Sequence, residues 1–178
     1  MSYGSGPNPY PAGQAPYGAP QQFGAPALSP DIAPLPGAGF GEAVKRFFQR
    51  YAQFRGYASR SEYWWPWLLN AVIGFVLSLF TVIPMLTAMT AAIEAAQNGE
   101  PPVEPAYSTG VLMMSGVSSL YSLAILLPSL SVLVRRLHDT GKSGVWFFIV
   151  FVPIVGPIWL LVLLASESRP DLYRPEWS

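Results

Sequence analysis

Three long stretches of the chain hold apolar and small residues without a formal charge. They cover residues 63–93, 105–134 and 143–166, and are 31, 30 and 24 residues long. A helix needs about 20 apolar residues to cross the hydrocarbon core of a bilayer. The pattern therefore predicts an all-α membrane protein with about three transmembrane helices, near residues 63–93, 107–134 and 144–165.

The first and third stretches each leave a choice open. The first is longer than one straight span needs, which predicts a tilted helix or one kinked near Pro84. The third carries Pro153, Gly156 and Pro157 near its middle. We expect a single kinked span there, and the alternative is a break that returns the chain as a re-entrant hairpin.

The second stretch carries several serines on one helical face. At the spacing of a helix, this face predicts close packing of two helices through small residues and hydroxyl groups. The alternative is a polar stripe for permeation. The serines are Ser115, Ser118, Ser119 and Ser122.

Two segments precede the first stretch. Residues 1–39 hold nine prolines and seven glycines, with Asp31 as their one charge. This composition predicts a disordered Pro/Gly/Tyr-rich tail that acts as a flexible tether, or as a weak aromatic contact region. Residues 40–54 alternate between an aromatic face and a basic face, which predicts an amphipathic interfacial helix on anionic lipid. The basic face holds Lys45, Arg46 and Arg50, and the aromatic face holds Phe40, Val44, Phe47, Phe48, Tyr51 and Phe54.

The positive charges predict the orientation. Five Lys or Arg side chains lie between residues 45 and 60, none lies between 94 and 107, and three lie between 135 and 142. Because loops rich in Lys and Arg stay in the cytoplasm, the N-terminus and the second loop are expected there. A single third span would place the C-terminus outside, whereas a hairpin would bring Arg169 and Arg174 back inside.

Composition narrows the function. The chain is 51% hydrophobic and 11% charged, whereas a soluble domain carries about 25% charged residues. The formal net charge is zero, so no nucleic-acid partner is expected. The chain has no cysteine and one histidine, which argues against a zinc or iron–sulfur site. We expect no cofactor and no metal.

A charged collar is predicted where two blocks, residues 54–65 and 135–148, meet at the cytoplasmic face. We expect Glu62 to pair with Arg136 or Arg135, and Asp139 to hold Arg60 or one of those two arginines. We favour a structural role, in which these ion pairs hold the helix ends together at the level of the lipid headgroups. The alternative is a site for anionic headgroups or phosphate. The candidate residues of the collar are Arg55, Arg60, Glu62, Arg135, Arg136, His138, Asp139 and Lys142.

Catalytic patterns are weak in this block. The sequence GKS at 141–143 is not a phosphate loop, because Arg136 stands where that motif needs glycine. His138 and Asp139 are neighbours, so on a helix their side chains point about 100° apart and do not form an acid–base pair. We assign no catalytic residue and expect that the protein is not an enzyme.

The two blocks, FRGYASRSEYWW and RRLHDTGKSGVWFF, resemble the DUF805 family of small bacterial inner-membrane proteins. The resemblance covers about residues 40–175 and implies an integral membrane fold without a settled activity. Two positions depart from the family pattern. Tyr57 stands where the family usually has Arg, and the C-terminal motif is reduced to LYRPEW with Tyr173 and Pro175.

These observations lead to two hypotheses for the function. The first is a non-enzymatic scaffold or interaction protein of the bacterial cytoplasmic (inner) membrane, crossing it several times with the N-terminus in the cytoplasm. Its partners would be the lipid bilayer with its anionic headgroups, and another protein or a second copy of the chain. The alternative is a module that binds anionic lipid or phosphate, coupled to transport.

Overall fold

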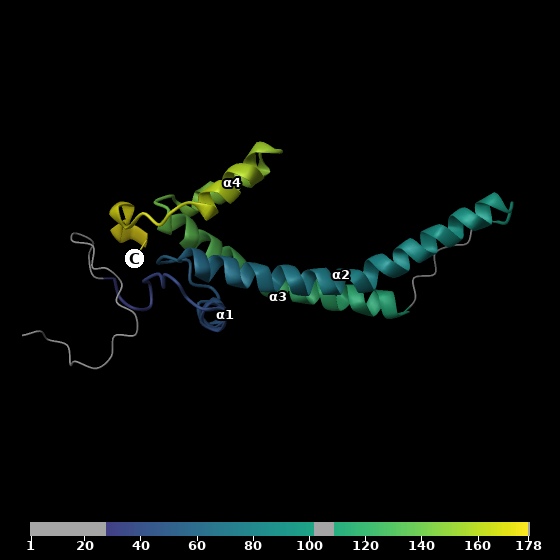
Figure 1. Cartoon of the computed structure of the whole chain (residues 1–178), viewed down its shortest axis with the longest axis horizontal. Helices are drawn as coiled ribbons and strands as arrows, with labels where there is room; N and C mark the ends of the chain where they lie inside the picture. The colour runs from purple at the N-terminus through teal and green to yellow at the C-terminus, as the bar shows by residue number, and fades with distance from the viewer. Residues whose placement is uncertain (1–27, 102–108, 178) are drawn as a thin grey trace, which may run out of the picture.

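A computed structural model describes residues 28–101 and 109–177 of the chain, and every regular element in these residues is a helix. Residues 1–27 of the predicted tail and part of the predicted loop at 94–107 lie outside the described residues. The all-helical prediction is confirmed for the part described (Figure 1). In chain order the elements are α1 (Phe40–Gln49), α2 (Arg60–Gln97), α3 (Thr109–Asp139), the 3₁₀ helix η1 (Gly144–Phe151), α4 (Val155–Ala165), and the short 3₁₀ helices η2 (Pro170–Leu172) and η3 (Pro175–Trp177).

The helices α2 and α3 run antiparallel and pack side by side (Figure 1). Both are long and apolar enough to cross a membrane, as the first two charge-free stretches predicted. At 38 residues α2 is about 57 Å long, and it bends in the C-terminal half that contains Pro84. Inside the pair, the Tyr121 hydroxyl donates to Asn70 Oδ1 at 2.5 Å, so a polar contact ties the two helices together.

Most of the predicted serine face does not pack against α2. Ser118 is half-buried, whereas Ser115, Ser119 and Ser122 are exposed. Each of the four hydroxyl groups donates to a carbonyl of its own helix. Within one chain, Ser118 and Ser122 line the space between α2 and α3, whereas Ser115 and Ser119 do not.

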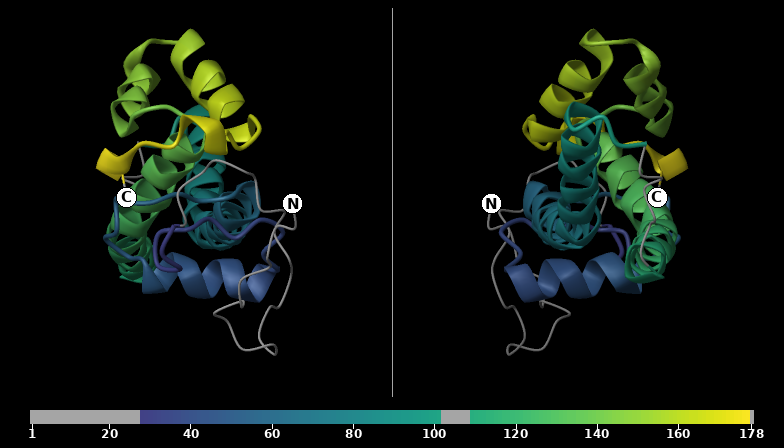
Figure 2. Two further views of the ribbon diagram at one scale, coloured as in Figure 1. Left: turned by 90° about the vertical axis from the view of Figure 1, so that its left-hand side faces the viewer. Right: turned by 90° about the vertical axis from the view of Figure 1, so that its right-hand side faces the viewer.

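The third apolar stretch is not one helix, and the prediction of a single span over 144–165 is wrong. The chain runs out along η1, breaks at residues 152–154, and returns along α4 as a hairpin (Figure 2). Ile154 adopts a φ of 68°, which ends any continuous helix. Both ends of the hairpin lie at the last turns of α3, because Gly144 lies against Val134 and the Leu164 carbonyl accepts from Arg136.

The hairpin depends on one close contact. A Cβ built on Gly156 would lie 1.8 Å from the Ile149 carbonyl oxygen. Only glycine allows α4 to begin so near the backbone of η1. The structure therefore has the hairpin that we named as the alternative to a single span.

The core lies where α1, the start of α2, the end of α3 and the end of α4 converge. Phe47, Tyr63, Val132, Leu137 and Leu163 are among its buried residues. The rest of the long helices exposes apolar side chains to their surroundings. The core therefore stabilises the junction of the helices rather than their length.

The amphipathic helix is shorter than predicted and is held by the protein. It ends at Gln49 rather than at residue 54. The Ser131 hydroxyl bonds to the carbonyls of Arg50 and Gln53, at 3.0 and 2.7 Å, and stabilises the turn that follows. Phe47 packs in the core, and Arg50 is buried, so neither side chain has the lipid-facing position expected for an interfacial helix.

The described part of the predicted tail, residues 28–39, also packs against the domain. The Leu35 amide donates to Glu62 Oε2 at 2.7 Å, and the Ile32 carbonyl accepts from the Tyr57 amide at 2.9 Å. The boundary drawn after residue 39 is therefore wrong for these twelve residues. Their prolines leave carbonyls free for partners in the rest of the chain.

Candidate functional site

The last turn of α3 buries its charges. Arg135, Arg136 and Asp139 are 1%, 0% and 0% exposed. Buried charges are costly unless they are paired and hydrogen-bonded. The partners of these three side chains therefore show what the collar does.

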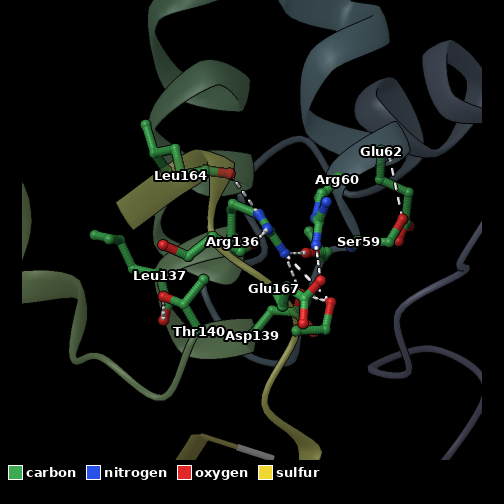
Figure 3. Close-up of polar contacts among 12 residues, drawn as sticks. Ser59, Arg60, Glu62, Arg136, Leu137, Asp139, Thr140, Leu164 and Glu167 are labelled. Atoms are coloured by element: carbon green, nitrogen blue, oxygen red, sulfur yellow. Dashed lines mark hydrogen bonds and ion pairs between the residues drawn. The ribbon is translucent and has the colours of Figure 1, made fainter. Parts of the chain in front are cut away.

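Arg136 binds the end of α4. Its Nε donates to the Leu164 carbonyl at 2.9 Å, and its Nη2 donates to the Ser166 carbonyl. The last carbonyls of a helix have no partner within it, so one guanidinium supplies the missing donors. Its Nη1 forms an ion pair with Asp139, one of the pairs expected from the sequence (Figure 3).

Asp139 binds the segment that follows α4. Its carboxylate accepts from the Ser168 hydroxyl at 2.6 Å and from the Tyr173 hydroxyl at 2.5 Å. The Asp139 carbonyl also accepts from the Arg169 amide at 2.7 Å. Burial raises the pKa of the Tyr173 phenol, and the neighbouring Asp139 raises it further, so Tyr173 stays a neutral donor.

Tyr57, which departs from the family pattern, lies against Tyr173, which the reduced C-terminal motif keeps. The rings of Tyr57 and Tyr173 are stacked with centroids 3.6 Å apart. The Tyr57 hydroxyl contacts both the amide and the carbonyl of Arg174 at 3.1 Å. The Arg136–Asp139 pair and the Tyr57–Tyr173 stack, with the segment 164–177 that they hold, are called the clasp below.

His138 completes the clasp without contacting its neighbour in sequence. Its Nδ1 lies 3.2 Å from the Gly56 carbonyl, and its ring stacks on Trp177 with centroids 4.5 Å apart. Asp139 has other partners. The two side chains therefore form no acid–base pair. Among the described residues, no group of three or more His, Asp or Glu side chains is placed to hold a metal.

Two of the pairings predicted for the collar are wrong. Glu62 pairs with Arg46 at 3.0 Å rather than with Arg135 or Arg136, because α1 packs across the start of α2. Arg60 lies 3.4 Å from Glu167 rather than against Asp139. The Arg60–Glu167 pair is exposed, so it contributes little to stability.

The two remaining collar residues are not buried, since Lys142 is half-buried and Arg55 is exposed to solvent. The ammonium of Lys142 lies 5.4 Å from the centre of the Trp146 ring. Neither takes part in the buried network. The structure therefore brings Glu62, Arg135, Arg136, His138 and Asp139 into the protein interior and leaves Arg55, Arg60 and Lys142 outside it.

A second buried cluster contains residues that the sequence had assigned to lipid. Arg46 and Arg50 of α1 lie near Arg135 and Glu62. Glu62 also forms a capping box at the start of α2, where its Oε2 accepts from the Ser59 amide at 3.0 Å. Burial lowers the pKa of the Arg50 guanidinium, and the positive charge of Arg46 lowers it further. The signal in the sequence is the basic face of α1, which we expected to lie against anionic lipid headgroups.

Fold and site define a helical membrane protein whose buried charges hold its own C-terminal segment. The family described as "Protein of unknown function (DUF805)" matches residues 51–174. The chain belongs to the DUF805 family.

Two Escherichia coli K12 proteins are similar over most of their length. "Inner membrane protein YhaI" is 34% identical over 126 residues, which cover 71% of this chain and 85% of YhaI. "Inner membrane protein YhaH" is 31% identical over 119 residues, which cover 67% of this chain and 78% of YhaH. No solved structure matches the chain significantly.

Proposed function

We propose that this chain is a non-enzymatic scaffold or interaction protein of the bacterial cytoplasmic membrane. The clasp is the observation that supports it. Arg136 and Asp139 are fully buried and bind groups of the same chain. In an enzyme, such side chains would face a cavity for the substrate. Here they bind the C-terminal segment to the helix ends.

The proposed location is the inner membrane, with both described ends of the domain at the cytoplasmic face. The names of the relatives YhaI and YhaH describe them as inner membrane proteins. Positive charges gather where α2 begins and where α3 ends. The C-terminal segment belongs to the same face, because the Gly56 amide donates to the Trp177 carbonyl at 2.5 Å.

The surface proposed for a partner is the exposed side of α3. Small side chains at Ser115, Ser119 and Ser122 allow another helix to approach closely. Large apolar side chains flank them, including Leu120 and Leu123. The partner would be a transmembrane helix of another protein or of a second copy of this chain.

Photo-crosslinking in intact membranes tests this proposal. A photoreactive amino acid replaces Ser119 in the full chain, and a matched variant carries it at Ser131, which is buried. We expect discrete protein adducts from position 119 and none from position 131. Adducts with lipid alone at position 119 would contradict a scaffold that acts through α3.

A further inference from the structure

The second buried cluster carries more positive than negative charge. Arg46, Arg50 and Arg135 surround the single carboxylate of Glu62. The carboxylate of Asp31 also attracts Arg50, but it is exposed to solvent, so within the buried cluster three guanidinium charges less one carboxylate charge leave two positive charges. Glu62 accepts from the amides of Leu35 and Ser59 through Oε2, and its Oε1 forms the ion pair with Arg46 but no hydrogen bond among the described residues. No other acid in the described residues pairs with this cluster.

Arg135 is the least satisfied member. Its side chain is 1% exposed. Its Nε lies 3.4 Å from the Ser131 carbonyl, and its Nη2 is buried without a hydrogen-bond partner among the described residues. A buried guanidinium with an unused donor is unfavourable. Such a group is expected to donate a hydrogen bond to an oxygen of a ligand that can reach it.

Neutral oxygens cover the other two arginines. Residues 29–35, called the strap, run across α1. The Pro30 carbonyl accepts from Arg50 Nη2 at 3.0 Å, and the Ala33 carbonyl accepts from Arg46 Nη2 at 3.1 Å. A carbonyl carries only a partial charge, so these contacts solvate the arginines without neutralising them.

The strap is also bordered by a cavity. The space between the strap and α1 has a volume of about 410 Å³, and Lys45, Arg46 and one acid, Glu42, lie in its wall. The strap is held to α2 by the bonds of Leu35 with Glu62 and Ser59, and to the segment after α1 by two bonds, from the Tyr57 amide to the Ile32 carbonyl and from the Gln53 side chain to the Asp31 carbonyl. An anion could therefore approach beside the strap and take over the donors that Pro30 and Ala33 now occupy.

We propose that Arg46, Arg50 and Arg135 form a binding site for a phosphate group, and that the strap is the lid of this site. Guanidinium groups bind phosphate oxygens in bidentate pairs, and the three arginines of this cluster are close enough for their charges to interact. A phosphate monoester or inorganic phosphate carries up to two negative charges and balances the two positive charges of the cluster. A phosphodiester carries one and leaves the cluster half balanced. Arg135 lies at the end of α3, far along the helix from the exposed serines proposed for a partner, and the site does not include the clasp, so it does not depend on the proposed scaffold role.

The full chain in lipid nanodiscs tests the site. In one arm, nanodiscs of phosphatidylcholine receive inorganic phosphate or, at equal ionic strength, sodium chloride. In the other, phosphatidic acid, which has a monoester headgroup, is compared with phosphatidylglycerol, a diester, at equal surface charge. The measurement is the thermal unfolding midpoint. A rise with inorganic phosphate indicates a soluble ligand, and a rise with phosphatidic acid alone indicates a lipid headgroup.

Matched variants locate the effect. Arg135→Gln and Arg50→Gln should abolish the rise, whereas Arg55→Gln removes the same charge from an exposed position and should keep it. Without ligand, Arg135→Gln should unfold no earlier than the parent chain, because it removes a buried unmatched charge. A rise of equal size in Arg135→Gln and Arg55→Gln, or no rise in either arm, would overturn the proposal.

A second measurement does not depend on the folding of an arginine variant. The chain has no cysteine, so Ser29→Cys provides a unique position for a spin label on the exposed start of the strap. The label should become more mobile when inorganic phosphate or phosphatidic acid binds. Unchanged mobility in both arms would show that the strap is not a lid.

Discussion

At the scale of residues, burial rather than sequence proximity decides which charges matter. Asp139 gains donors from Ser168 and Tyr173 because its side chain is enclosed by the C-terminal segment. Arg60 and Glu167 also form a pair, but both are open to solvent, at 47% and 89% exposure. An exposed pair contributes at most about 1 kcal/mol, so stability should respond to the buried network.

The Tyr173 hydroxyl gives a prediction that depends on pH. Tyr173→Phe leaves the buried Asp139 carboxylate without one donor, and should destabilise the fold by about 1.5–3 kcal/mol at pH 7. The pKa of Tyr173 is raised in the folded chain, so its contribution is present below pH about 10 and is lost as pH rises above it. Unfolding midpoints in detergent between pH 7 and 11 should show the gap between the two proteins narrowing at the alkaline end. A constant gap would mean that the phenol does not titrate with folding.

Glu62 gives a second prediction. In a double-mutant cycle, Glu62→Gln and Arg46→Gln should be coupled by about 0.5–3 kcal/mol, because the two side chains form an ion pair. Glu62→Gln with Arg136→Gln serves as the control, since Arg136 binds α4 and Asp139 instead. The measurement is thermal stability in detergent. Stronger coupling in the control cycle than in the first would contradict the pairing in the structure.

At the scale of elements, the hairpin of η1 and α4 is the feature most sensitive to a single methyl group. Its two limbs meet at Gly156, which lies against the backbone of Ile149. Backbone atoms move less readily than the end of a side chain. The hairpin therefore has little room to adjust at this contact.

Gly156→Ala should separate the two limbs of the hairpin. Overpacking costs about 1–3 kcal/mol in a packed core, and a contact with backbone should reach the upper part of that range. Gly116→Ala in α3 is the matched control, because nothing lies within 4 Å of a Cβ there. It should be neutral or stabilising by up to about 1 kcal/mol. Equal thermal stability of the two variants would show that the close contact does not exist.

Long elements could be predicted from the sequence, and their junctions could not. The charge-free stretches located α2 and α3, because a long apolar run is sufficient to indicate such a helix. The third stretch was as apolar as the others, but hydropathy does not distinguish a helix that continues from one that returns. That distinction depends on tertiary contacts, such as Arg136 with the Leu164 carbonyl.

The same reason explains the result for the candidate site. Five of the eight collar residues are buried at the helix junction. The sequence placed these charges next to apolar residues, which is compatible with burial. Their partners were assigned by charge alone. Arg46 pairs with Glu62 because α1 packs against α2. This packing has no local signal in the sequence. The carbonyl partners were also unpredictable, since every residue carries a carbonyl.

At the scale of the whole molecule, the structure links the position of the C-terminal segment to that of the N-terminal approach. Residues 164–177 lie at the end of the molecule where α2 begins and α3 ends (Figure 1). Two long helices and one returning hairpin produce this arrangement. Three spans would have separated the two segments by the thickness of a membrane.

Topology reporters test this arrangement in cells. Fusions after residue 100 should report the periplasm, and fusions after residue 178 should report the cytoplasm, because the hairpin returns the chain to its starting side. A fusion at the N-terminus is the control for a cytoplasmic position. A periplasmic signal after residue 178 would restore the single third span and contradict the hairpin.

The clasp also has a consequence for the order in which the protein matures. A chain whose synthesis stops before residue 164 has α2 and α3 but not residues 164–177, so Arg136 and Asp139 lack most of their partners in it. The charged side chains at the end of α3 are enclosed only when residues 164–177 are present. Nascent chains that stop before residue 164 therefore carry an unclosed polar junction at the membrane surface, and membrane proteases that survey new proteins would meet such chains in a form that the finished protein does not display.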